Sequence, residues 1–248
     1  MFPIRDHNPS NQTPYVTYVL IVANVLVFLS YFGLFADPQA LQYFFLEWAM
    51  IPERVSSGQG LHTLFTSIFM HGGLLHLAGN MLFLWIFGDN LEEDLGHLGF
   101  LLFYLACGIG ASLAHVLAAP WSEVPTVGAS GAIAGVMGGY LLMYPRARVD
   151  VMVIFIIFFR VFPLPAWLML GVWFGIQLIS GATADMSMGG VAYWAHAGGF
   201  VLGLAAMIPV WLSKGGPGYW ARTHGHPDHP EATYRFQRTH VPNVKRRR

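Results

Sequence analysis

Long stretches without a charged side chain divide this sequence, and they limit its possible folds more than any other feature. Each stretch can hold a membrane-spanning helix of about 20 residues. Hydrophobic residues make up 55% of the chain and charged residues only 10%, whereas roughly a quarter of the residues in soluble domains are charged. The sequence therefore predicts a multi-pass integral membrane protein. The charge-free stretches are residues 7–36, 55–88, 95–122, 124–145, 161–184 and 186–213.

These stretches predict an all-α membrane protein, built as a bundle of six transmembrane helices. An apolar run of this length favours a helix because a helix satisfies its own backbone hydrogen bonds inside the bilayer. We expect the helices near residues 15–35, 71–88, 97–119, 129–144, 163–183 and 191–212.

The helices predict one core, residues 15–213, with a segment on either side. Residues 1–14 are expected to be a cytoplasmic N-terminal segment, and residues 214–248 a basic, mobile cytoplasmic tail. The connection over residues 33–70 mixes aromatic with charged side chains, which indicates a long, partly helical extracytoplasmic loop. Residues 149–162 are apolar but interrupted by charges, and we expect an interfacial connection there, with a shallow re-entrant segment as the alternative.

The basic residues predict that both termini are cytoplasmic, because Lys and Arg near the ends of spans stay on that side of the membrane. With six spans, Arg5, Arg146, Arg148 and the basic residues of the tail share one side, and only Arg54 lies opposite. The formal net charge of zero hides this asymmetry. The basic clusters are explained by topology, so we expect no nucleic-acid partner.

Two polar side chains interrupt the apolar stretches: Ser130 in Gly-Ala-Ser-Gly and His196 in Ala-His-Ala-Gly-Gly. A serine and a histidine inside spans suggest a nucleophile and its base. Counting about 1.5 Å of rise per residue from the cytoplasmic ends puts both at one depth, together with His76. No Asp or Glu of the spans falls near that depth, so we predict a Ser/His dyad rather than a triad.

Glycines are spaced so that the fourth and sixth helices can approach each other closely. Small residues at such spacing allow close packing in lipid, although alone they indicate only packing. His196 shares a helix face with the glycines that follow it. The residues expected to pack are Gly128, Gly131, Gly135, Gly199 and Gly203.

The second helix carries His76 and Asn80, which are four residues apart and therefore share one face. Histidine and asparagine side chains donate hydrogen bonds, and beside a serine nucleophile they could form an oxyanion hole. The alternative is that they only bond neighbouring helices together.

Three motifs resemble those of the rhomboid family of intramembrane serine proteases, and they follow one another in the expected order along the chain. They are His-x4-His-x3-Asn in the second helix, Gly-x-Ser-Gly opening the fourth, and Ala-His-x-x-Gly-x-x-x-Gly in the sixth. The resemblance implies a six-helix bundle of rhomboid type, with Ser130 as nucleophile and His196 as general base and then acid. His76, Asn80 and the Ser130 backbone amide would form the oxyanion hole, and His71 would lie at the mouth of the site.

The resemblance also implies a function. The protein would be an intramembrane serine endopeptidase that cleaves single-span membrane proteins in or next to their spans through an acyl-enzyme, with no metal and no cofactor. It would reside in the lipid bilayer of the bacterial inner membrane. The chain departs from some members in carrying Ala134 one turn after the nucleophile, where they carry an aromatic residue that packs on the catalytic histidine. The orientation of His196 would then depend on other contacts.

Two other classes of function stay open at this point. A non-catalytic rhomboid-like protein that binds membrane helices, as a chaperone or quality-control factor, would keep the same architecture. A metal or proton transporter could use His71, His76 and His196, but the core lacks the acidic partners that such transport usually needs.

Overall fold

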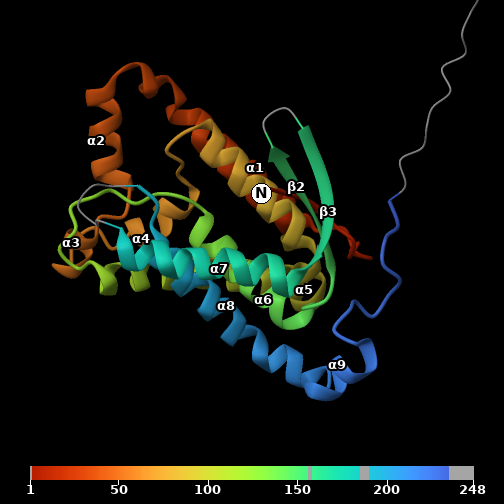
Figure 1. The fold of residues 1–248 in the computed structure, drawn as a ribbon. Helices are drawn as coiled ribbons and strands as arrows, with labels where there is room; N and C mark the ends of the chain where they lie inside the picture. The colour runs from red at the N-terminus through yellow and green to blue at the C-terminus, as the bar shows by residue number, and fades with distance from the viewer. Residues whose placement is uncertain (1, 156–157, 185–189, 235–248) are drawn as a thin grey trace, which may run out of the picture.

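The computed structural model describes residues 2–155, 158–184 and 190–234, and most of them are helical. Figure 1 shows the helices packed into one bundle, with a small sheet on one side of it. The helices are α1 (Tyr15–Tyr31), η1 (Phe32–Ala36), α2 (Pro38–Trp48), α3 (Pro52–Ser56), α4 (Thr63–Thr66), η2 (Ser67–Phe69), α5 (Leu74–Ala118), α6 (Ser130–Met143), α7 (Ala166–Thr183), α8 (Tyr193–Ser213) and α9 (Pro217–Thr223).

The described part of the chain holds four helical stretches that are long and apolar enough to cross a membrane. They are Tyr15–Ala36, Leu74–Ala118, Ala166–Thr183 and Tyr193–Ser213, and α6 is a shorter apolar helix. Gly96 interrupts α5 with a φ of 69° and a ψ of 164°, a conformation that glycine adopts at little cost. The two segments of α5 correspond to the predicted second and third helices. The structure confirms a helical membrane bundle, while the count of six spans stays a prediction.

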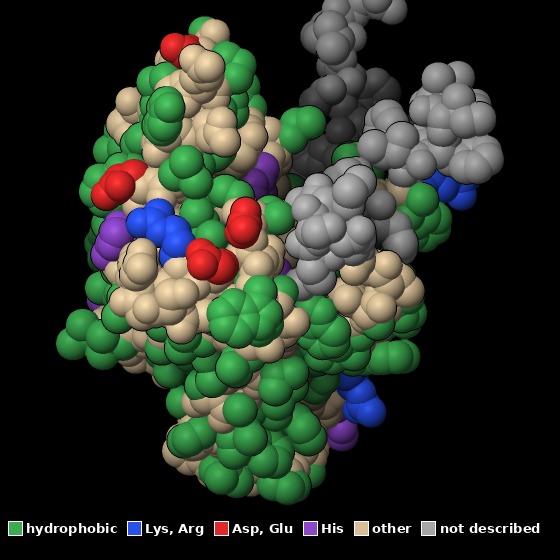
Figure 2. All heavy atoms as spheres, turned by 90° about the vertical axis from the view of Figure 1, so that its left-hand side faces the viewer, with side chains coloured by type: hydrophobic (Ala, Val, Ile, Leu, Met, Phe, Trp, Pro, Cys, Tyr) green, Lys and Arg blue, Asp and Glu red, His purple; other side chains and the backbone are tan. Residues whose placement is uncertain are grey.

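The outer faces of the bundle are apolar, as a lipid-facing surface requires. Large hydrophobic side chains lie exposed along three of the helices, which would be unusual on a soluble monomer. Figure 2 shows one face of the molecule, with hydrophobic side chains over much of its lower part and most of the charged side chains higher up. Exposed hydrophobic residues include Val19, Leu26 and Leu29 of α1, Leu98, Leu102 and Leu117 of α5, and Val172, Ile176 and Ile179 of α7.

The helix α6 lies at the centre of the bundle. Every residue from Gly131 to Tyr140 is buried, and α6 packs chiefly against α8 and α5. A helix that is apolar on all sides is expected to be buried on all sides. Its first residue, Ser130, is thereby held between the two helices that carry the other candidate site residues.

The connection over residues 149–162 forms a β-hairpin over most of its length, and its expected place at the membrane interface stays a prediction. The strands β2 (Arg148–Phe155) and β3 (Phe158–Pro165) pair antiparallel, and β1 (Phe2–Asp6) adds a third antiparallel strand beside β2. The segment is rich in Val, Ile and Phe, which favour strands. The hydrophobicity of this segment suggested membrane contact. In the structure, its backbone N–H and C=O groups are hydrogen-bonded between paired strands.

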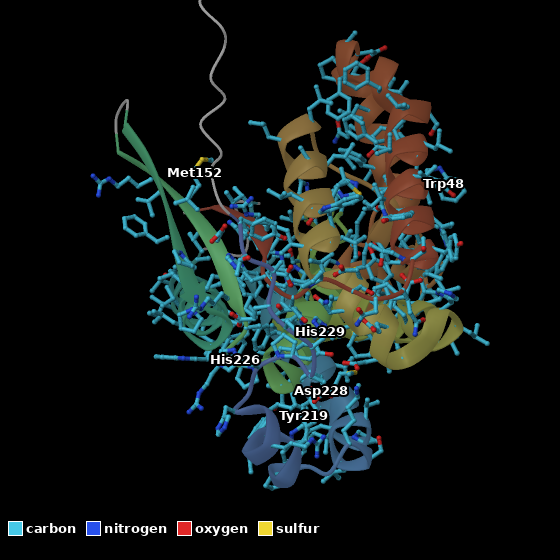
Figure 3. The ribbon with its side chains drawn as sticks, turned by 90° about the vertical axis from the view of Figure 1, so that its right-hand side faces the viewer. Trp48, Met152, Tyr219, His226, Asp228 and His229 are labelled. Atoms are coloured by element: carbon cyan, nitrogen blue, oxygen red, sulfur yellow. The ribbon has the colours of Figure 1, made fainter. Side chains whose placement is uncertain are left out.

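The beginning of the segment that we expected to be a mobile tail is folded onto the rest of the protein. Tyr219 of α9 is fully buried, and the indole Nε1 of Trp220 donates to the carbonyl of Leu142 at 3.0 Å. Figure 3 shows Tyr219, His226, Asp228 and His229 at one end of the molecule, with Trp48 of α2 toward the other. Residues 235–248 lie outside the described residues.

Residues 224–234 continue from α9 and run beside the sheet. The backbone N–H of Ala232 donates to the carbonyl of His7 at 2.9 Å, and His7 Nδ1 bonds back to the carbonyl of Ala232 at 2.8 Å. His7 Nε2 in turn lies 2.9 Å from Asp150 Oδ1, while Arg5 Nε donates to Asp150 Oδ2 at 2.7 Å. The buried carboxylate of Asp150 therefore links β1, β2 and, through His7, the C-terminal segment.

A second buried carboxylate, Glu92 of α5, holds the start of α1. Pro14 gives this helix no side-chain cap. Glu92 instead accepts hydrogen bonds from the backbone N–H groups of Val16 and Thr17, each at 2.8 Å, and from the Thr17 hydroxyl at 2.7 Å. A negative charge at a helix N-terminus also interacts favourably with the helix dipole. Glu92 thus fixes α1 against α5.

Removing the Glu92 carboxylate should destabilise the protein. We expect Glu92→Ala to lower the free energy of unfolding by about 3 kcal/mol, because buried N–H groups lose a charged acceptor. The measurement is the unfolding midpoint in detergent micelles. Glu93→Ala is the matched control, since Glu93 makes only exposed hydrogen bonds with Asn11. Equal losses in the two variants would contradict the capping role of Glu92.

The link through Asp150 should depend on pH in a defined direction. Burial acts to raise the pKa of Asp150, but the hydrogen bonds and charges of His7 and Arg5 outweigh it and hold this pKa below its ordinary value of 3.8. A depressed carboxyl pKa contributes stability above the unfolded-state value, and that stability is lost as the pH falls through the folded-state pKa. The attachment of residues 224–234 should therefore be intact at neutral pH and weaken below pH 3.8.

The variant Asp150→Asn should weaken this attachment at neutral pH as well. We expect the amide of Ala232 to exchange with solvent about tenfold faster, because the charged acceptor that holds His7 is lost. Hydrogen exchange followed by mass spectrometry measures this rate. Asp228→Asn, at an exposed position of the same segment, should leave the rate unchanged. Wild-type exchange in Asp150→Asn would show that the segment is held by other contacts.

Candidate active site

Two helix starts bring Ser130 and His196 together. Ser130 is the first residue of α6, and His196 lies in the first turn of α8. A hydrogen bond of 2.7 Å joins Ser130 Oγ and His196 Nε2. This distance is within the range over which a base can take a proton from a nucleophile.

Glycines allow the backbones of α6 and α8 to touch beside this pair. An added Cβ at Gly199 would overlap the carbonyl oxygen of Gly131, and one at Gly203 would overlap that of Gly135. The two α6 glycines present their own Cα atoms to α5, where a Cβ at Gly131 would lie 2.6 Å from the Cβ of Ala111. The α6 glycines thus allow close contact with α5, and the α8 glycines allow close contact with α6. The contact between α8 and α6 sets the distance between Ser130 and His196.

Gly128 leaves a gap between Ser130 and His76 of α5. Its φ is 135°, and an added Cβ would lie 2.9 Å from His76 Nε2 and 3.4 Å from Ser130 Oγ. A side chain at this position would therefore be strained and would also block the gap between the two polar groups. The gap belongs to a cavity of about 550 Å³, lined among others by His76, Asn80, Gly128, Ser130, Gly131 and His196.

His76 and Asn80 both face this cavity from the first turns of α5. The backbone N–H of Gly72 donates to His76 Nδ1 at 3.3 Å, so in the neutral ring the proton resides on Nε2 and can be donated into the cavity. Asn80 Nδ2 is buried and has no hydrogen-bond partner within the described residues. Both side chains can therefore donate to a ligand beside Ser130.

His71 does not lie where the resemblance would place it. Its side chain is fully buried, with its ring centroid 5.1 Å from that of His76, and it is not among the residues that line the cavity. The reason is its backbone, because the Tyr31 hydroxyl donates to the His71 carbonyl at 2.8 Å and accepts from its N–H at 2.7 Å. The structure places His71 against His76 rather than at a mouth of the site.

Two residues of α7 contact His196 and were not among the predicted site residues. Gln177 Oε1 lies 2.8 Å from His196 Nδ1, and the ring centroid of Trp173 lies 5.7 Å from that of the histidine. The available signal was a glutamine inside an otherwise apolar span, since such amides usually bond between helices. Among the residues that the structure describes, no group of three or more His, Cys, Asp or Glu is arranged to bind a metal.

A methyl group at Gly199 should separate Ser130 from His196. We expect Gly199→Ala to lower the free energy of unfolding by about 2 kcal/mol, because its Cβ meets a backbone carbonyl that cannot move cheaply. The rate at which a fluorophosphonate labels Ser130 should fall at least tenfold with it. Gly175→Ala on α7 is the matched control, since an added Cβ there has no atom within 4 Å. Wild-type labelling of Gly199→Ala would contradict the packing argument.

Known proteins similar to this chain were found in bacteria, yeast and plants. A Rhomboid domain matches residues 58–213. The chain is 29% identical to "Rhomboid protein 1, mitochondrial" of Saccharomyces cerevisiae over 200 residues, which is 76% of this chain and 51% of the yeast protein. It is 37% identical to "Rhomboid protease GluP" of Bacillus subtilis over 133 residues, 53% of this chain and 25% of that protein.

A third similar protein is "Putative rhomboid protease YdcA" of Bacillus subtilis, 41% identical over 80 residues, which is 32% of this chain and 40% of YdcA. The matched region spans about half or less of the length of each of these relatives. The Rhomboid domain itself covers more than half of this chain and includes α5, α6, α7 and α8. With its long apolar helices, the chain is an integral membrane protein and belongs to the rhomboid family.

Proposed function

We propose that this protein is an intramembrane serine endopeptidase that hydrolyses peptide bonds in or next to the transmembrane segments of membrane proteins. The observation that carries the proposal is the 2.7 Å hydrogen bond between Ser130 Oγ and His196 Nε2 at the wall of a cavity. Family membership supports it, because two of the similar proteins are named rhomboid proteases.

In the proposed reaction, Ser130 Oγ attacks the scissile carbonyl carbon while His196 Nε2 takes the hydroxyl proton. The tetrahedral intermediate collapses as His196 returns that proton to the leaving amine, which leaves an acyl-enzyme on Ser130. A water molecule then attacks the ester carbonyl carbon and gives a proton to His196. The ester C–O bond breaks as His196 returns that proton to Ser130 Oγ, which releases the carboxylic acid product and restores the serine. A Ser/His dyad suffices for both steps because one histidine acts first as base and then as acid.

The negative oxygen of each tetrahedral intermediate needs hydrogen-bond donors, and we assign this role to His76, Asn80 and the backbone N–H of Ser130. Asn80 Nδ2 is buried without a partner among the described residues, and His76, whose Nδ1 accepts from the backbone N–H of Gly72, lines the same cavity with Nε2 as its donor. The N–H of Ser130 belongs to the first turn of α6, where backbone N–H groups have no partner inside the helix. Such preorganised donors commonly contribute more to rate than any other single feature.

We propose single-span membrane proteins as substrates, with a small residue before the cut and helix-weakening residues near it. A peptide bond within a helix is shielded by its hydrogen bonds, so the segment must unwind before Ser130 can reach it. We also propose the bacterial inner membrane as the location, with both termini cytoplasmic. The distribution of Lys and Arg along the chain supports this orientation, and α9, which carries Arg222, lies at the end of the molecule opposite to α2 (Figure 1).

Replacing the nucleophile tests this proposal. Liposomes containing the protein and a generic single-span substrate should yield a cut within or beside the span, located by mass spectrometry. We expect Ser130→Ala to lower the cleavage rate by at least about 10³-fold, because no other group can form the acyl-enzyme. Ser30→Ala, on the exposed face of α1, should cleave like the wild type. Cleavage by Ser130→Ala at the wild-type rate would assign the reaction to another residue. If the wild type and Ser130→Ala both bind the substrate and neither cleaves it, the result would instead favour a non-catalytic membrane-helix binder.

A further inference from the structure

Ser130 bonds to one ring nitrogen of His196, Nε2. The side-chain amide of Gln177, on α7, faces the other ring nitrogen, Nδ1. Gln177 is buried, and its Oε1 lies 2.8 Å from His196 Nδ1. We infer that Gln177 is a positioning residue for His196, so that the proposed dyad has a third, uncharged member on α7. The inference rests on the proposed function, because it assigns a partner to the proposed base.

The direction of the Gln177 amide is fixed by a second contact. Gln177 Nε2 donates to the backbone carbonyl of Trp173 at 3.2 Å, and a carbonyl can only accept. The other end of the amide, Oε1, is therefore the atom that faces His196, and it too can only accept. His196 Nδ1 must then carry the proton and donate it to Gln177.

This proton arrangement is the one that the proposed reaction needs. With the proton on Nδ1, the neutral ring presents the Nε2 lone pair to Ser130 Oγ, 2.7 Å away. In the other tautomer, Nε2 would carry a proton and could not accept one from the serine. Gln177 therefore selects the reactive form of the histidine, as the carboxylate does in a Ser/His/Asp triad.

The same helix also orients the plane of the imidazole ring. Trp173 lies one turn before Gln177, and its ring is tilted 33° to that of His196 at a centroid distance of 5.7 Å. On α6, the residue one turn after Ser130 is the fully buried Ala134, which has no ring to place against the histidine. The contacts that hold the base thus come from α7, which packs beside α8 (Figure 1).

The test compares two replacements of Gln177 of similar size. Gln177→Met removes the acceptor, and we expect kcat to fall roughly 10- to 100-fold with KM unchanged, because the wrong tautomer is no longer disfavoured. Fluorophosphonate labelling of Ser130 should slow by a similar factor. Gln177→Glu keeps an acceptor at the same place, so we expect the folded variant to remain within about threefold of the wild-type rate, with the cost of its buried charge seen in the free energy of unfolding. Ile176→Met, on the lipid-facing side of the same helix, should label and cleave like the wild type.

Each result separates this inference from the proposed function. If the wild type neither labels nor cleaves, the proposed function has failed. If the wild type does both and a folded Gln177→Met does so at the same rate, the dyad stands and the positioning role is overturned. A loss that Gln177→Glu shares fully would indicate packing rather than hydrogen bonding, and would also overturn it.

A second measurement needs no replacement of Gln177. Nitrogen-15 NMR of protein labelled on its histidines, with His196→Ala used to assign the His196 signals, reports which ring nitrogen carries the proton. We expect His196 to be in the Nδ1–H form throughout the pH range in which the ring is neutral. A ring protonated on Nε2, or a mixture of the two tautomers, would overturn the inference.

Discussion

The contact between the backbones of α6 and α8 is the constraint on which the rest of the site depends. At Gly199 and Gly203 the two helices approach so closely that a Cβ would overlap the opposite carbonyl oxygens. In lipid, helices gain little from burying apolar surface, so packing without side chains is the means by which two backbones come together. Ser130 and His196 occupy the first turns of these helices, and their hydrogen bond is a consequence of that approach.

The helix α5 contacts several parts of the protein around this contact: the cavity, α6 and the start of α1. Near its start it supplies His76 and Asn80 to the cavity, and beyond the break at Gly96 its second segment places Ala111 against α6. Between these parts, the buried Glu92 holds the start of α1. A helix that is interrupted at Gly96 thereby connects elements that lie far apart in the sequence. The polar residues that α5 supplies to the site line the cavity, whereas Leu98, Leu102 and Leu117 of the same helix are exposed.

The sequence was most informative where a single physical rule governs the chain. Charge-free length predicts apolar helices, and the common depth of Ser130, His196 and His76 in those helices indicated a site. The structure brings Ser130 and His196 within hydrogen-bonding distance. The hairpin of β2 and β3 could not be foreseen from hydropathy, because a membrane and a partner strand both accept an apolar segment. Gln177 could not be paired with His196 from the sequence either, since the rotation of α7 that aims its amide depends on packing that no local pattern encodes.

The site lies between apolar helices, and this location explains why the group at His196 Nδ1 is the amide of Gln177. A carboxylate there would hold the imidazolium more strongly, but between apolar helices it would have to be buried as a charge whenever the histidine is neutral, and that desolvation is costly. The amide of Gln177 fixes the same tautomer without burying a charge. In the proposed reaction, this amide would stabilise a protonated His196 less than a carboxylate would, and it adds no charge to the resting site. A span surrounded by lipid therefore favours glutamine at a position where a soluble serine protease carries aspartate.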